Sequence, residues 1–133
     1  MGKTSEQDSD AHLNDPLCRH LGISFTTVSD GVAVAQMRVT EDHLNMNGTL
    51  HGGAIFSLAD SAAGAALESL LEDTTSVALE ANISFLTAAE QGDTVTAKAE
   101  VTNESRKTAE MTVNIVLFDG TEIATFRGRG YKV

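Results

Sequence analysis

The 133-residue chain contains no tryptophan and only one cysteine, one proline and one tyrosine. The single cysteine, Cys18, excludes a disulfide within the chain, which is typical of proteins in reducing compartments. We therefore expect a cytoplasmic location. The sequence also lacks any apolar run of about 18 residues, the length that a membrane-spanning helix requires. We expect no membrane association.

The first eleven residues are polar and acidic, and they lack the apolar segment of a secretory signal. We expect residues 1–11 to form a disordered acidic leader. The remaining residues, 12–133, are enough for one hydrophobic core and show no internal repeat or linker. They are predicted to form a single domain.

Positive charge is scarce. Nine lysines and arginines stand against 19 acidic residues, which gives a net charge of -10. This excess disfavours binding to nucleic acid or to anionic membranes. Five of the nine basic residues lie near the C-terminus: Arg106, Lys107, Arg127, Arg129 and Lys132. A polyanionic ligand would be expected to bind where these residues gather.

The hydrophobic pattern predicts two strands, one long helix and four further strands. The expected strands cover residues 23–28, 32–39, 76–86, 94–101, 108–118 and 122–132, and the expected helix covers residues 52–71. A short helix or irregular lead-in is expected over residues 12–20, and a loop over 41–50. Turns are indicated at Ser29-Asp30-Gly31 and, with a two-residue loop, at Asp119-Gly120. The order predicts an α+β domain whose antiparallel sheet wraps one central helix.

The predicted helix is apolar on nearly every side, so we expect it to be buried. Its apolar residues recur at helical spacing: Ile55, Leu58, Ala59, Ala62, Ala66 and Leu70. The small residues Ala63 and Gly64 would allow another backbone to approach closely.

Polar, glycine-rich residues lie immediately before this helix, and Asp60 lies two turns inside it. Free backbone N–H groups at a helix start attract negative charge, including the oxygen of a polarised carbonyl. A carboxylate among apolar neighbours is costly unless it has a partner or a function. The alternative to a function is an ion pair with a strand arginine such as Arg38. The combination predicts an acyl-transfer or hydrolytic site.

Residues 45–60 carry a recognisable motif, Asn-x-x-Gly-x-x-His-Gly-Gly, with an aspartate seven residues after the last glycine. The motif resembles that of the hotdog-fold acyl-CoA thioesterases, in the PaaI-like (phenylacetate-pathway) branch of the 4-hydroxybenzoyl-CoA thioesterase superfamily. The element order from about Pro16 onward is also similar. The resemblance implies a hotdog fold, with five to six antiparallel strands around one helix. It also implies hydrolysis of an acyl-CoA to free acid and CoA, without metal or cofactor.

The resemblance assigns roles to the motif residues. The Gly53 N–H, with that of Gly52, would stabilise the charge that develops on the thioester oxygen. Asp60 would act as general base on water or as nucleophile, and both roles stay open. Asn45 would position the water or the carbonyl, and His51 would orient Asn45 or the loop.

Further roles concern substrate binding. Ser57 is expected to line the acyl pocket, and Arg106 and Lys107, at a strand-to-strand turn, to contact the CoA phosphates. Some relatives carry a serine or threonine on the strand after the helix. Here that position falls on Ala78, with Ser76 nearby, so the chain departs from the pattern.

Gly53 and Asp60 share a helical face but lie roughly 10 Å apart along the axis. One thioester group can hardly touch both in a single helix. If both residues serve one reaction, Asp60 must meet the helix start of another copy, which predicts a homodimer with paired antiparallel helices and two composite sites. The resemblance implies the same assembly, in some relatives paired again into a homotetramer.

Other sites and functions are weaker. His43, His51 and Asp60 are badly spaced for zinc and no second cysteine supports them, so we expect no metal. Ser57 lacks the G-x-S-x-G setting of a nucleophilic serine. An enoyl-thioester hydratase or dehydratase of the same fold, and a non-catalytic acyl-CoA-binding module, remain alternatives. Coenzyme A and acyl carrier protein both remain possible carriers of the acyl group.

Overall fold

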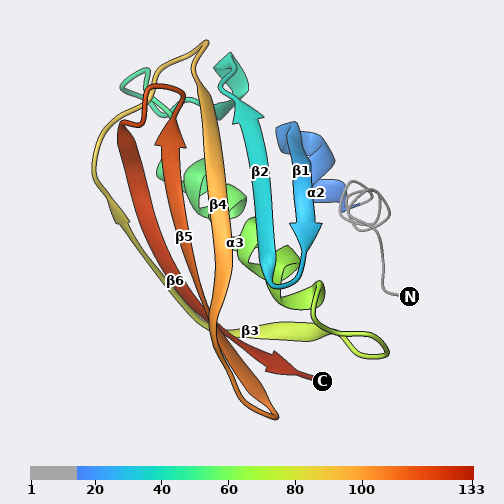
Figure 1. Cartoon of the computed structure of the whole chain (residues 1–133). Helices are drawn as coiled ribbons and strands as arrows, with labels where there is room; N and C mark the ends of the chain where they lie inside the picture. Colours follow the sequence, from blue (N-terminus) through green and yellow to red (C-terminus); the bar gives the residue numbers. More distant parts are fainter. Residues whose placement is uncertain (1–14) are drawn as a thin grey trace.

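The computed structural model describes residues 15–133 as one long helix and a six-stranded antiparallel sheet of order β1-β2-β4-β5-β6-β3. The elements are α2 (Pro16–Leu21), β1 (Ile23–Ser29), β2 (Val32–Arg38), η1 (Glu41–His43), α3 (Gly52–Glu68), β3 (Ser76–Phe85), β4 (Thr94–Glu104), β5 (Thr108–Leu117) and β6 (Glu122–Lys132). The sheet curves around α3 (Figure 1). The predicted α+β hotdog architecture is confirmed. The expected leader, residues 1–11, lies outside the described residues.

The two predicted hairpins both form, but one loop is longer than expected. Asp30 and Gly31 have φ values of 54° and 81°, as the turn between β1 and β2 requires. Between β5 and β6, the Leu117 N–H donates to the Thr121 carbonyl, so the loop spans residues 118–120 and the two-residue prediction is wrong. A glycine at φ 91°, Gly120, ends this loop and allows the longer form.

Helix α3 ends at Glu68, before the predicted residue 71. The Ser69 hydroxyl donates to the Ala66 carbonyl and accepts the Gly31 N–H, which ties the helix end to the β1–β2 turn. The Leu70 and Leu71 N–H groups bond three residues back, so the last turn tightens and the α-helix stops.

One face of α3 is not fully covered by the part of the chain that the structure describes, residues 15–133. The face toward the sheet is fully buried, as at Leu58, Ala59 and Ala62. The remaining side is a row of small or polar residues that keep solvent contact: Gly53, Ser57, Asp60, Ser61, Gly64 and Glu68. We call this row the open stripe of α3. The prediction that the helix is buried all round is therefore wrong for a single copy.

Strand β3 is an edge of the sheet and is largely exposed. Its side chains include exposed apolar ones at Val77, Leu79 and Phe85, the second 55% exposed. The opposite edge is β1, which α2 accompanies (Figure 1). Within residues 15–133, no helix is both long and apolar enough to cross a membrane.

Candidate active site

The loop before α3 is organised by the side chain of Asn45. Its Oδ1 accepts the backbone N–H groups of Asn47 and Thr49, at 2.9 and 3.1 Å, and its Nδ2 donates to the Thr49 hydroxyl at 3.0 Å. The loop turns at Gly48, with φ 82°. Asn45 thus holds the loop in place and keeps one amide hydrogen outside these bonds.

His51 is the N-cap of α3. Its Nδ1 accepts the Gly53 N–H at 2.7 Å, so the neutral ring carries its proton on Nε2. The imidazole caps the helix in this arrangement, and the expected role of His51 in orienting Asn45 or the loop stays a prediction. The N–H expected to meet a thioester oxygen is already donated. A substrate oxygen can take it only after the exposed His51 ring rotates away.

Gly52 has a separate packing reason to be glycine. A Cβ at this position would lie 3.1 Å from Cζ of Phe85. The ring of Phe85 therefore approaches the start of α3 closely, which a side chain at residue 52 would prevent.

Asp60 lies on the open stripe and is exposed. Within residues 15–133 its carboxylate has no hydrogen bond or ion pair, and the alternative pairing with Arg38 does not occur. Partial burial among its neighbours raises the pKa of Asp60 above its ordinary value, although the residue still contacts solvent. An unpaired, partly desolvated carboxylate is the state expected of a base or nucleophile.

Three cavities lie along α3, and they separate the predicted site residues. One of about 310 Å³ contains Asp60, one of about 260 Å³ contains His51, Gly53 and Ser57, and one of about 350 Å³ contains Asn45 and Gly52. The structure therefore brings His51, Gly53 and Ser57 together, and it places Asn45 on another side of the helix start. Asp60 lines neither of these two cavities. No group of three or more metal-binding side chains occurs among the described residues.

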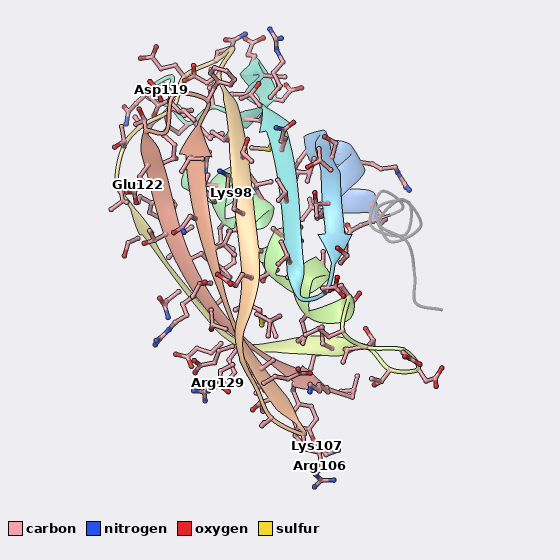
Figure 2. All side chains as sticks on the ribbon, viewed as in Figure 1. Lys98, Arg106, Lys107, Asp119, Glu122 and Arg129 are labelled. Carbon is pink, nitrogen blue, oxygen red and sulfur yellow. The ribbon has the colours of Figure 1, made fainter. Side chains whose placement is uncertain are left out.

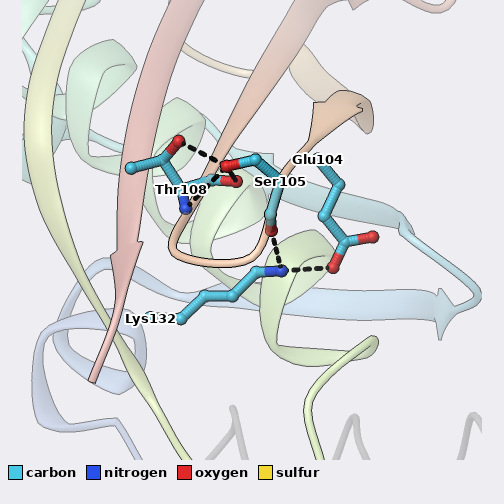
Figure 3. Close-up of polar contacts among 4 residues, drawn as sticks. All are labelled: Glu104, Ser105, Thr108 and Lys132. Atoms are coloured by element: carbon cyan, nitrogen blue, oxygen red, sulfur yellow. Dashed lines mark hydrogen bonds and ion pairs between the residues drawn. The ribbon is translucent and has the colours of Figure 1, made fainter.

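The predicted phosphate-binding residues Arg106 and Lys107 lie at the tip of the β4–β5 hairpin (Figure 2). Lys132 holds this tip, because its Nζ contacts Glu104 Oε2 at 2.7 Å and the Ser105 carbonyl at 2.6 Å (Figure 3). The Lys107 Nζ lies 5.7 Å from the ring centroid of Tyr131. The tip is thus a supported structure whose cations face outward.

Contacts place this tip at the C-terminal end of α3. The Lys132 N–H donates to the Lys107 carbonyl, and Lys132 pairs with Ser76 on β3. The adjacent Thr75 donates its hydroxyl to Glu68, the last residue of the helix. Within one copy, Arg106 and Lys107 therefore lie at the opposite end of α3 from Gly53.

The cavity around Asp60 contains residues that the sequence did not indicate or placed only approximately. Ser76 and Ala78 both line the Asp60 cavity, so a hydroxyl is present there although Ala78 was the expected position. Two residues apart on a strand share a face, and this alternation was the available signal. Ser61 and Cys18 line the same cavity, with the Cys18 thiol 3.4 Å from the Ser61 hydroxyl, but no pattern in the sequence joins them.

Comparison with known proteins points in one direction. The family model described as thioesterase superfamily matches residues 47–124. The chain is 36% identical over 120 residues to the acyl-coenzyme A thioesterase PaaI of Escherichia coli, covering 90% of this chain and 84% of that protein. It is 28% identical to human acyl-coenzyme A thioesterase 13 over 93 residues, covering 70% and 66% of the two chains.

Solved structures agree. The E. coli PaaI protein from the phenylacetic acid degradation operon superposes with a TM-score of 0.90 at 35% identity, covering 97% of this chain and 93% of that one. A hypothetical thioesterase from Streptococcus pneumoniae, solved with coenzyme A, superposes with a TM-score of 0.78 at 29% identity, covering 84% and 85%.

The cap on α3 predicts a stability effect. Replacing His51 by Ala removes the acceptor of the Gly53 N–H and should lower the free energy of unfolding by about 0.5–2 kcal/mol. His51→Asn restores a capping oxygen and should recover most of the loss. Urea unfolding of the three proteins measures the difference. Equal stability of His51→Ala and the parent would contradict the capping role.

The raised pKa of Asp60 predicts that the free energy of unfolding changes with pH in the opposite direction to that expected for a carboxylate in an ion pair. Because the folded-state pKa lies above the unfolded value of about 3.9, the Asp60 contribution to stability is present at low pH and is lost as pH rises through the folded-state pKa. Asp60→Asn should therefore be more stable than the parent at neutral pH, and this difference should shrink as pH falls. Urea unfolding over a pH series measures it.

Asp119 offers the matched comparison for this prediction. Hydrogen bonds with Thr121 lower the pKa of Asp119, so Asp119→Asn should lose stability at neutral pH. A neutral-pH loss of stability in Asp60→Asn as well would show that the Asp60 charge is stabilised rather than unpaired.

Proposed function

The chain belongs to the thioesterase superfamily, and from this we propose that it hydrolyses an acyl-CoA thioester to the free acid and CoA. The observation that carries the proposal is the unpaired Asp60 carboxylate on the open stripe of α3. Support comes from the relatives named acyl-CoA thioesterases and from the similar S. pneumoniae protein solved with coenzyme A. No cofactor or metal enters the reaction.

The proposed reaction uses the helix start and the carboxylate together. Once the His51 ring turns aside, the Gly53 N–H binds the thioester oxygen, and a donor of this kind contributes about 10²–10³ in rate. As general base, Asp60 takes a proton from water while the oxygen adds to the carbonyl carbon; the C–S bond then breaks and the proton passes to sulfur. As nucleophile, Asp60 instead adds to the carbonyl carbon, and the C–S bond breaks to leave a mixed anhydride and the CoA thiolate. Water then cleaves the anhydride to the free acid and the Asp60 carboxylate, and the released proton passes to the thiolate.

Neighbouring residues position the reactants. Gly52 supplies the adjacent N–H, and its lack of a side chain lets Phe85 close one side of the helix start. Asn45 offers its free amide hydrogen to the water or the carbonyl. The Ser57 hydroxyl, which donates to the Gly53 carbonyl at 2.9 Å, lines the cavity beside the acyl carbon.

The reaction requires two copies of the chain. A homodimer with antiparallel α3 helices would bring Asp60 of one copy to the Gly53 of the other, and two-fold symmetry creates two such sites. The open stripe suits this contact, since a methyl group at Gly64 would meet no atom within 4 Å. The exposed apolar edge strand β3 is a second surface for pairing. A homotetramer is the further assembly that we propose from the family resemblance.

The same pairing accounts for the basic hairpin tip. Since Arg106 and Lys107 lie at the C-terminal end of their own α3, antiparallel pairing would carry them toward the α3 start of the partner. There they would bind the phosphates of coenzyme A on a protein of net charge -10.

We also propose that residues 12–133 form a single domain and that the protein acts in the cytoplasm.

Loss of the carboxylate tests the function. Asp60→Asn should lower kcat for thiol release from acyl-CoA by about 10²–10⁴, because the variant keeps the shape of the side chain and loses the base or nucleophile. Glu68→Gln, on the same stripe, is the matched control and should stay close to the parent. Thiol release that survives Asp60→Asn would remove Asp60 from the mechanism.

Loss of the tip cations tests the phosphate site. Arg106→Gln with Lys107→Gln should raise KM with little change in kcat, because it removes binding common to ground and transition state. The rise should diminish as salt increases. Lys98→Gln, on the sheet surface away from the tip (Figure 2), is the control. An unchanged KM would place the phosphates elsewhere.

A further inference from the structure

We propose that the acyl group is held between α2 and the start of α3, and that Leu17 and Leu21 of α2 set the length of acyl chain accepted. This inference rests on the proposed hydrolysis of acyl-CoA. It assigns a specificity role to a short helix that lies outside the catalytic motif.

The starting point of the acyl chain is set by its carbonyl. If the thioester oxygen bonds to the Gly53 N–H, the carbonyl carbon and the first carbon of the acyl chain lie within a few ångströms of residue 53. Of the three cavities along α3, the one of about 260 Å³ contains Gly53. The cavity with Asp60 and the cavity with Asn45 do not contain it.

The composition of this cavity suits a hydrocarbon group with one polar end. Gly53 and Ser57 of α3 line one side, together with the His51 ring that must turn for the substrate oxygen. Leu17 and Leu21 of α2 and Leu44 line the far side, and Asp42 and His43 also border the cavity. A mainly apolar hollow bordered by a few polar groups is the usual form of a small-molecule site.

The two α2 leucines form one wall. They lie four residues apart, so they share a face of the helix. Among residues 15–133, Leu17 keeps 51% of its surface exposed. An acyl chain in the cavity would remove part of this apolar surface from water, which favours binding.

The wall is fixed in position rather than loose. Asp15 caps the start of α2, and the Cys18 thiol contacts the Ser61 hydroxyl of α3. At the other end, the buried His43 donates from Nε2 to the Leu21 carbonyl at 2.8 Å while its Nδ1 accepts the Thr40 N–H. Because α2 is held at both ends, it does not move to accommodate an extra methylene group, and it can therefore discriminate between acyl chains of different length.

The volume indicates which acyl groups fit. About 260 Å³ lies just below the usual range of small-molecule sites, roughly 300–1,000 Å³. A cavity of this size suits a short or medium-length acyl group, or one carrying a single ring.

Substitutions at Leu17 test the assignment in both directions. Leu17→Ala should move the best substrate in a series of straight-chain acyl-CoAs to longer chains, and Leu17→Phe to shorter ones. The ratio of kcat/KM between neighbouring members should change by at least about tenfold. Leu17 is exposed, so neither change should unfold the protein, and Leu21→Ala provides a second enlarging variant.

Leu86→Ala is the matched control, because Leu86 is equally exposed and lines the cavity on the Asn45 side of the helix start. Its chain-length profile should match that of the parent. A profile moved by Leu86→Ala and not by the Leu17 variants, or moved by none of them, overturns the inference. If the parent releases no thiol from any acyl-CoA, the proposed function fails instead. Affinities for the same acyl-CoAs then decide, since Leu17→Phe must still weaken binding of the longer chains.

Discussion

The distance between Gly53 and Asp60 along one rigid helix is the constraint on which the other features depend. A rise of about 1.5 Å per residue holds the N–H donor and the carboxylate roughly 10 Å apart, and no rearrangement of side chains closes that gap. The two residues occupy separate cavities in a single copy. The open stripe of α3 and the uncovered strand β3 are the parts of the chain that a second copy could complete.

The start of α3 has two competing uses for one hydrogen-bond donor. Without substrate, the Gly53 N–H is satisfied by His51, and the helix is stabilised by its cap. In the proposed reaction the same N–H would bind the thioester oxygen, so part of the binding free energy would go into displacing the imidazole. Asn45 also combines two roles, because its amide organises the loop and leaves one hydrogen that could bind the substrate or water. The stability and the activity of the site are thus coupled through a few bonds.

Local patterns in the sequence predicted most of the fold, and long-range contacts explain what they missed. Periodicity predicted α3 and all six strands, and the motif predicted the residues around the helix start. The predictions for the length of the β5–β6 loop and for the end of α3 were wrong, since each depends on hydrogen bonds that composition does not specify. The bond between His51 and Gly53 was not predicted. The places of Leu17 and Ser61 beside the cavities along α3 were missed, because they depend on elements that meet only in the folded chain.

The measurement that tests the composite site most directly is the activity of a heterodimer joining two inactive variants. One copy carries Asp60→Asn, and the other carries Gly53→Pro, which removes the N–H in a first helical turn where proline is tolerated. The account predicts that each variant alone is inactive, while the heterodimer, purified with two different tags, recovers about half of the parent activity through its one intact site. A heterodimer as inactive as the two variants would show that donor and carboxylate act within one copy, and would contradict the account.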